Sequence, residues 1–218
     1  SWREFIDPHQ SDPRVRCYQS DCNVGNYRIK NALIPELTGP FVAISDADDV
    51  NHEDRFQAQV KVMRRGRVDL LGSSYAHITP TGEVTKTRKM PRNANWWMKL
   101  GRGGSILFHP TMMTKLDVLQ YLNGFDGTTR ISADSDFVIR ASHFFRIRNL
   151  RKVLYYRRKH EKSLTSAPST GFKSEVRQEY LNGVRERRKA RQTMKGEELR
   201  VASQAPENDV VFNLTRLF

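Results

Sequence analysis

Three carboxylates follow a short apolar run near residue 45, and their spacing suits metal or phosphate chemistry. The run 41–44 ends at Ser45, and Asp46, Asp48 and Asp49 follow within four residues. Such a run predicts a buried strand whose end emerges at a sheet edge. Crowded carboxylates repel one another, by roughly 1 kcal/mol per pair at 4 Å in water and about 4 kcal/mol at an effective dielectric constant near 20. A divalent cation would remove that repulsion, and oxygen ligands favour Mg²⁺ or Mn²⁺. The alternative is a solvated acidic turn.

Helices and strands alternate along the chain and would position these carboxylates. Hydrophobic spacing and turn residues predict strands at 15–18, 41–45, 68–78, 83–87, 106–108 and 153–157. Helices are predicted at 26–34, 52–63, 115–122, 134–145 and 172–195. Residues 91–105 are predicted to form a flexible loop, and the last 18 residues a loose tail. This order predicts an α/β protein with a mixed sheet, in which ligands gather at the carboxyl ends of strands.

Two of the predicted helices have a recognisable apolar side. In the helix at 52–63, which Asn51 can cap, Phe56, Val60 and Met63 share one face. In the basic helix at 172–195, apolar side chains recur at every fourth position, at Phe172, Val176, Tyr180 and Val184. We expect both helices to pack through these side chains.

The chain has 218 residues and a formal net charge of +13, which is concentrated in one segment. Residues 146–200 contain 17 Lys and Arg residues against 6 Asp and Glu residues. A segment of this kind favours anionic partners, such as a phosphorylated substrate, an acidic lipid surface or nucleic acid. The alternative is a solvated helix, or one that packs against another domain.

Length and composition predict one globular domain at 1–165 and a basic helical extension with a loose tail at 166–218. No apolar stretch approaches the roughly 18 residues of a membrane-spanning helix, and the first residues lack the order of a signal peptide. Cys17 and Cys22 are too few for a disulfide scaffold, so reduced thiols are expected. We therefore expect a cytoplasmic protein, with peripheral membrane contact through 173–195 as an option.

Four blocks of residues, in this order, resemble the GT-A glycosyltransferases of family 2. The first is Asn23-Val24-Gly25 with Lys30-Asn31, and the second is Ser45-Asp46-Ala47-Asp48-Asp49. The third is Gly124-Phe125-Asp126 followed by Ala133-Asp134-Ser135-Asp136-Phe137 and Arg140. The fourth is Tyr156-Arg157 with His160 and Ser163, and His109-Pro110-Thr111 fits a block between the second and the third. Each block is short, and their order and spacing over residues 14–165 carry the resemblance.

The resemblance implies a GT-A-like, Rossmann-related mixed sheet flanked by helices, and an inverting, metal-dependent glycosyltransferase. The donor would be a nucleotide sugar, most simply a UDP-sugar, and the acceptor a saccharide, glycoconjugate or lipid-linked hydroxyl, as in polysaccharide biosynthesis. The chain departs from the family in two ways. The first two strands of the family, which hold the uridine, are missing, so the piece has lost donor binding or another domain or chain completes the nucleotide site. Ala133 replaces a Glu, which puts the acceptor contact of that Glu in doubt.

The resemblance also assigns roles to single residues. Donor binding is expected of Asn23, Gly25, Lys30, Asp46, Ala47 and Asp48. A divalent metal, Mn²⁺ or Mg²⁺, would be bound by Asp48, Asp46 and His160, and a surface location is the alternative for His160. Asp134 would be the general base for the acceptor hydroxyl, a contribution of roughly 10²- to 10⁴-fold, and it could also cap its helix. Acceptor contacts are expected from Trp96, Trp97, Gly103, Gly104, His109 and Asp136, although core packing explains one tryptophan equally well.

Two other functions fit part of the sequence. The strand before Asp46 also resembles that of a haloacid-dehalogenase-type phosphatase, in which Asp46 would form an aspartyl phosphate. That interpretation leaves residues 23–31 and 124–140 unexplained. The other is a non-catalytic basic module that binds polyanions through residues 146–200. No nucleic-acid-binding motif is visible, so nucleic acid is not expected as a partner.

Overall fold

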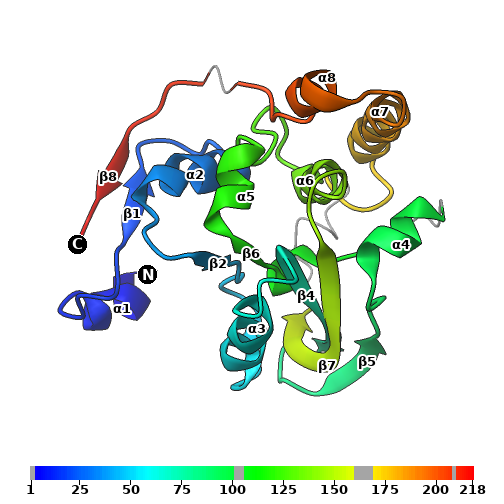
Figure 1. The fold of residues 1–218 in the computed structure, drawn as a ribbon. Coiled ribbons are helices and arrows are strands. Elements are labelled where there is room, and N and C mark those ends of the chain that lie inside the picture. The colour runs from blue at the N-terminus through cyan, green and yellow to red at the C-terminus, as the bar shows by residue number, and fades with distance from the viewer. Residues whose placement is uncertain (1–2, 101–105, 160–168, 208–209) are drawn as a thin grey trace.

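Figure 1 shows the computed structural model of the chain, which describes residues 3–100, 106–159, 169–207 and 210–218. The central mixed sheet has the strand order β2–β6–β4–β7–β3, with β5 paired to β4. The strands are β1 (Tyr18–Ser20), β2 (Phe41–Ala43), β3 (Val50–Asn51), β4 (Leu70–Ile78), β5 (Val84–Arg88), β6 (Met113–Lys115), β7 (Ile147–Arg158) and β8 (Leu214–Arg216). The helices are α1 (Arg3–Ile6), α2 (Asn26–Leu33), α3 (Arg55–Met63), α4 (Ala94–Lys99), α5 (Leu116–Tyr121), α6 (Ala133–Ala141), α7 (Glu175–Arg191) and α8 (Gly196–Ala202). The predicted α/β class with a mixed sheet is confirmed.

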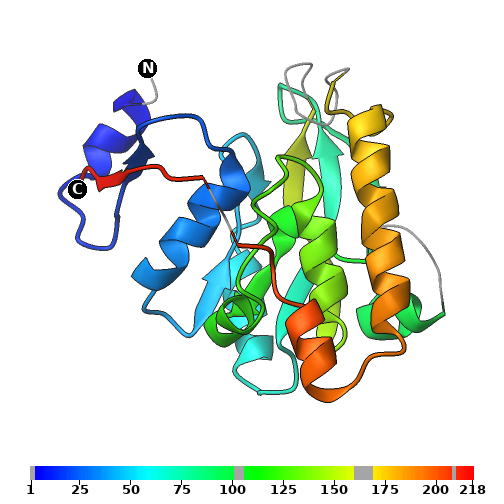
Figure 2. The ribbon, with the colours of Figure 1, turned by 90° about the horizontal axis from the view of Figure 1, so that it is seen from above.

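The two longest strands, β4 and β7, run parallel and end at the same edge of the sheet. Leu70 pairs with Ile147 at their start, and Ile78 pairs with Arg158 at their end. Figure 2 shows their arrowheads side by side, pointing in one direction. Side chains that follow these strands therefore meet at one edge, which is where an α/β sheet binds its ligands.

Hydrophobic side chains pack on both faces of the sheet because neighbouring strand residues point to opposite sides. Leu70 belongs to a large core with α2, α4, α5 and α6, which includes Phe125 and Phe137. Leu71 belongs to a smaller core with α3, in which it contacts Met63 and its neighbours. The sheet thus lies between α3 and the other helices.

The predicted inner face of α3 is confirmed for Met63, which is buried, and for Val60, which packs against the smaller core. It is wrong for Phe56, which is 43% exposed, whereas Arg55 and Gln59 are buried. The guanidinium of Arg55 donates to the carbonyl of Ile44 at 2.7 Å, so a polar side chain binds the sheet edge where an apolar one was expected. Asn51 does not cap the helix, because it lies in β3 and accepts a hydrogen bond from Arg55.

The C-terminal segment is more ordered than predicted. After α7 the chain forms α8, and β8 then pairs antiparallel with β1. The backbone N–H of Cys17 donates to the carbonyl of Phe218 at 3.0 Å, and Figure 1 shows both termini on this side of the molecule. The strand pairing was not visible in the sequence because its two partners lie at opposite ends of the chain.

Other local predictions need correction. Residues 94–99 form α4 where a loop was expected, because Asn93 caps the helix by accepting from the backbone N–H of Trp96. Residues 106–108 are largely buried but do not form a strand. In α7 the apolar stripe is only half right, since Val184 is buried while Phe172 and Val176 are 60% and 61% exposed. No helix in the described parts of the chain combines the length and the apolar composition needed to cross a membrane.

Candidate functional site

The acidic turn after β2 is fixed against the end of β7. The backbone N–H of Asp46 donates to the hydroxyl of Tyr155 at 3.2 Å, and the carboxylate of Asp49 accepts from the backbone N–H of Arg158 at 2.7 Å. Ala47 and Asp48 are exposed at the tip of the turn, while Asp46 is partly buried. The turn therefore presents its carboxylates at the edge where β4 and β7 end.

The second acidic motif reaches the site from α6. Asp134 lies in the first turn of α6, where the partial positive charge of the helix N-terminus stabilises a carboxylate. Its Oδ1 accepts a hydrogen bond from the hydroxyl of Tyr27 at 3.2 Å. Burial and the charge of Asp134 raise the pKa of Tyr27, so Tyr27 keeps its proton and acts as a donor. The carboxylate of Asp134 is thus held in one orientation.

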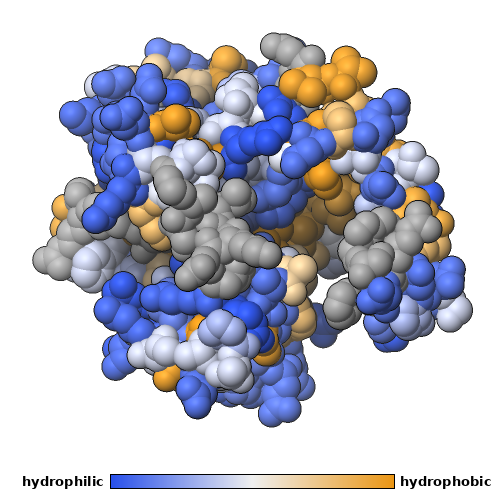
Figure 3. Space-filling view, turned by 180° about the vertical axis from the view of Figure 1, so that it is seen from behind, coloured by the Kyte–Doolittle hydropathy of each residue, from blue (hydrophilic) through white to orange (hydrophobic). Residues whose placement is uncertain are grey.

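Lys30 of α2 connects the two acidic motifs. Its ammonium group is within electrostatic range of both Asp46 and Asp134, and its Nζ donates to Nε2 of His109 at 3.3 Å. The two carboxylates therefore share one cation, although they come from distant parts of the sequence. Figure 3 shows the side of the molecule to which β4 and β7 point, and this side is hollowed near its middle.

The charges at the site perturb one another. Burial lowers the pKa of Lys30, against the pull of the two carboxylates. Burial also raises the pKa of Asp46, assisted by repulsion from Asp48 and Asp134 and opposed by Lys30. Burial and the nearby Lys30 lower the pKa of His109 to about 4, so His109 stays neutral and can accept from Lys30. Perturbed pKa values in one place are typical of functional sites.

Two of the sequence blocks touch each other directly. The side-chain amide of Asn31 donates to the carbonyl of Phe125 at 2.7 Å and accepts from its N–H at 2.8 Å. Gly124 has a positive φ of 68°, and a Cβ there would overlap the amide oxygen of Asn31. This pairing joins α2 to the loop before α6 and so positions Lys30 relative to Asp134.

The other residues of the first block lie at the start of α2. Gly25 precedes the helix with φ of 84°, a conformation that favours glycine. The carbonyl of Asn23 accepts from Arg130 at 2.7 Å. Both residues thus contact the loop that leads into α6, on the same side of the domain as Asp134.

The predicted acceptor residues lie in different places. His109 is brought to the site, where it is 7% exposed and accepts from Nζ of Lys30 at 3.3 Å. The amide of Asn95 in α4 donates to the carbonyls of Ser142 and Phe145 after the C-terminal end of α6, whereas Asp134 lies at the N-terminal end. The helix α4 that carries Trp96 and Trp97 is therefore about 12 Å away along the axis of α6. Gly103, Gly104 and His160 lie outside the described residues.

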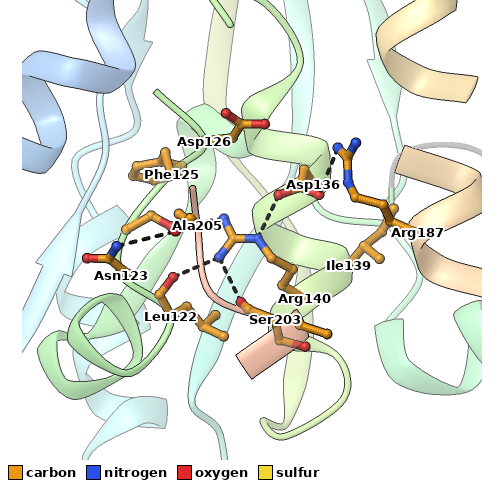
Figure 4. A network of polar contacts seen from close by, with 12 residues as sticks. Leu122, Asn123, Phe125, Asp126, Asp136, Ile139, Arg140, Arg187, Ser203 and Ala205 are labelled. Atoms are coloured by element: carbon orange, nitrogen blue, oxygen red, sulfur yellow. Dashed lines mark hydrogen bonds and ion pairs between the residues drawn. The ribbon is translucent and has the colours of Figure 1, made fainter. Parts of the chain in front are cut away.

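Asp136, a predicted acceptor contact, lies in a buried cluster of arginine side chains. It is 2% exposed and accepts a hydrogen bond from Nε of Arg140 at 2.6 Å. Arg187 and Arg191 of α7 approach its other oxygen at 3.6 and 4.0 Å. Figure 4 shows these groups between α6 and the C-terminal helices. The helical spacing places Asp136 on a different side of α6 from Asp134.

Three residues that no sequence motif marked, together with Arg157 of the fourth block, line or support the site. Tyr27 orients Asp134, and it could have been found from helical spacing because it precedes Lys30 by three positions. Tyr155 holds the acidic turn, and Arg157 lies within electrostatic range of Asp46. Arg177 of α7 donates to the hydroxyl of Ser132 at 2.9 Å and interacts electrostatically with Asp134. Nothing local in the sequence marks Arg177, because its partners come from another helix.

The described residues contain no group of three His, Cys, Asp or Glu side chains suited to a metal ion. Asp46 and Asp48 supply two carboxylates at the exposed end of the turn. A cation that completes its coordination with substrate phosphates needs only one or two protein carboxylates. The carboxylates of Asp46 and Asp48 therefore suit a metal ion that takes its remaining ligands from the substrate.

Comparison with known proteins identifies the family. Residues 2–123 match the family model described as glycosyl transferase family 2. The chain belongs to this family. The match includes the strand and acidic turn that also suggested a phosphatase, so the phosphatase interpretation has lost its support.

Two kinds of relatives agree with this assignment. An uncharacterized glycosyltransferase of Methanocaldococcus jannaschii is 31% identical over 133 residues, which are 60% of this chain and 46% of that protein. The crystal structure of S. aureus TarS 1-349 shares the fold with a TM-score of 0.58 at 17% identity, over 71% of this chain and 47% of that one. The same TarS piece in complex with UDP-GlcNAc also has a TM-score of 0.58, at 18% identity over 73% of this chain and 46% of that one. The chain thus spans about half the length of the relatives it matches. The GT-A fold expected from the resemblance is confirmed.

Proposed function

We propose that the protein transfers a sugar from a nucleotide-sugar donor, a UDP-sugar, to a hydroxyl group of a saccharide or glycoconjugate, with inversion at the anomeric carbon. The observation that carries the proposal is the meeting of Asp46 and Asp134 beside Lys30 at the carboxyl edge of the sheet. Glycosyl transfer needs charge stabilisation for a leaving diphosphate and a base for the acceptor. The acidic turn at Asp46 can help to stabilise the charge of the diphosphate, and Asp134 can act as the base.

Asp134 is the proposed base. Its position in the first turn of α6 and the hydrogen bond from Tyr27 hold its carboxylate in one orientation. Asp134 takes the proton of the acceptor hydroxyl while the hydroxyl oxygen forms its bond to the anomeric carbon. The bond from that carbon to the diphosphate oxygen breaks with its electron pair on the diphosphate. A single displacement of this kind inverts the anomeric configuration.

Asp46, Ala47 and Asp48 form the proposed donor side, together with Lys30, Asn23 and Gly25. Asp48 with Asp46, and His160 outside the described residues, would hold a divalent metal. When bound, Mn²⁺ or Mg²⁺ acts as a Lewis acid that stabilises the charge of the leaving diphosphate. The ammonium of Lys30 lies within electrostatic range of Asp46 and offers a further positive charge to the donor. The complex of TarS with UDP-GlcNAc supports the choice of a UDP-sugar.

We also propose contacts with a membrane, with a further domain or chain, and with a larger acceptor. The exposed Phe172 and Lys173 precede α7, and the exposed Val176 lies in its first turn; together they favour peripheral contact with an anionic membrane. A further domain or chain could complete the uridine site. The half-exposed Trp96 is available for a larger acceptor.

Binding and transfer can be tested separately. Titration calorimetry with UDP, with and without Mn²⁺, should show metal-dependent binding that Asp48→Ala weakens. Asp134→Asn should retain UDP binding and lose transfer, measured as UDP release from a UDP-sugar with added acceptor. UDP binding that needs no metal, or that is the same in Asp48→Ala, would contradict the proposed donor site. Full transfer by Asp134→Asn would contradict the proposed base.

A further inference from the structure

Four cationic side chains surround His77 on one face of the sheet, next to the proposed transfer site. We call them the basic strip, which consists of Lys86 and Arg88 of β5, Arg157 of β7 and Lys159, which follows β7; all four act electrostatically on His77. His77 in β4 pairs with Lys86 on one side and with Arg157 on the other, and Tyr75 pairs with Arg88. Paired residues, and residues two apart in one strand, point to the same face. The strip therefore crosses β5, β4 and the end of β7.

Three members of the strip, Lys86, Arg88 and Lys159, form no ion pair within the described residues. All three side chains are exposed. Burial lowers the pKa of His77 to about 4, and the surrounding cations lower it further in the same direction. A surface of this sign attracts anions.

Aromatic rings lie beside the strip and join it to the transfer site. The rings of Tyr75 and Phe108 stack with centroids 3.9 Å apart, and the guanidinium of Arg157 lies 5.8 Å from the centroid of Phe108. Arg157 is also within electrostatic range of Asp46. Aromatic surface with a few charged groups is typical of sites for polar organic ligands, and guanidinium groups match phosphate oxygens.

We propose that the basic strip binds the acceptor, and that the acceptor is a glycan that carries phosphate groups. The inference rests on the proposed function, and it adds the chemical class of the acceptor. The strip begins beside Asp46 and leads outward along β5, so it can hold the part of a chain that extends beyond the reacting hydroxyl.

The test compares charge reversal in the strip with the same change elsewhere. Lys86→Glu with Arg88→Glu alters β5, whose residues are all exposed, so the fold should persist. Arg185→Glu with Lys189→Glu alters two exposed residues of α7 and serves as the matched control. The probes are a phosphorylated maltodextrin, the same maltodextrin after phosphatase treatment, phosphatidylglycerol vesicles and single-stranded DNA. Calorimetry with UDP reports on the donor site in every variant.

The wild-type protein should bind the phosphorylated maltodextrin more tightly than the dephosphorylated form. The change in β5 should weaken that binding about tenfold or more, and the control should leave it unchanged. An equal effect of both double variants, or no difference between the two maltodextrins, would overturn the proposal. Tighter binding of vesicles or DNA, lost through the change in β5, would overturn it in favour of a different partner. Failure of the wild type to bind UDP with Mn²⁺ would instead count against the donor site.

Discussion

The buried pair of Asp136 and Arg140 offers a sharp test of how the C-terminal helices are attached. Arg140 is 1% exposed, and its guanidinium makes hydrogen bonds to Asp136 at 2.6 Å and to three carbonyl oxygens at 2.9 to 3.2 Å. Those carbonyls belong to Leu122, Gly124 and Ser203, so one side chain joins α6 to the loop after α5 and to the end of α8. Figure 4 shows this arrangement.

Arg140→Met keeps most of the side-chain volume and removes the charge and all four hydrogen bonds. Breaking a buried ion pair by removing one partner costs about 3–5 kcal/mol, because the other charge stays buried. Asp136 keeps Arg187 and Arg191 nearby, at 3.6 and 4.0 Å, which argues for the lower half of that range. A domain of this size loses roughly 2–4 °C of melting temperature per kcal/mol, so we expect a decrease of about 6–16 °C.

Urea denaturation followed by circular dichroism measures the free energy of unfolding, and scanning calorimetry measures the melting temperature. The matched control is Arg200→Met, which removes an exposed ion pair with Glu197 and should leave both values unchanged. The double variant Asp136→Asn with Arg140→Met should be less destabilised than the sum of the single variants, since the two charges interact directly. A loss below about 1 kcal/mol for Arg140→Met would refute the reasoning, because it would show that the contacts contribute little.

Three further predictions follow from single contacts. Gly124→Ala should lower the melting temperature by several degrees, since φ of 68° is unfavourable and a Cβ would displace the amide of Asn31. Arg177→Gln should reduce the rate of transfer more than the affinity for UDP, because Arg177 contacts the start of α6 and interacts with Asp134. Asp69→Asn should destabilise the protein at pH 7, and the loss should become smaller as the pH falls below about 3.9, in urea denaturation at pH 7 and at one value below about 3.9.

The sign of the last prediction follows from the surroundings of Asp69. Burial disfavours its carboxylate, but the ammonium of Lys115 at 2.7 Å and the N–H of Arg146 at 2.9 Å outweigh burial and hold the pKa of Asp69 below its ordinary value. A lowered folded-state pKa gives stability that is present above the unfolded-state pKa and is lost as the pH falls through the folded-state value. A stability difference of the same size at both pH values would contradict this account. Gly66→Ala, at another positive φ with open space around it, is the control for Gly124→Ala. Equal losses of transfer and UDP affinity in Arg177→Gln would show a general structural effect.

Local patterns in the sequence predicted most elements that carry the site. The apolar run before Asp46 became β2, the helix stopped by Pro35 became α2, and the helix that begins near Asp134 became α6. These predictions succeeded because strand alternation, helical spacing and turn residues act over a few positions. Side-chain orientation was less predictable, since Arg55 and Arg177 are buried by hydrogen bonds to groups that no local pattern reveals.

The sequence by itself determined the α/β class, the order of the elements α2, β2 and α6 that carry the site, and the chemical character of both acidic motifs, because these depend on neighbouring residues. Only the tertiary structure decided that Lys30 lies near both Asp46 and Asp134. It also decided that Asp136 faces α7 and that β8 pairs with β1. Such contacts join residues far apart in the chain, and their free energy depends on burial and on the distance between charges, which arise only when the helices pack on the sheet.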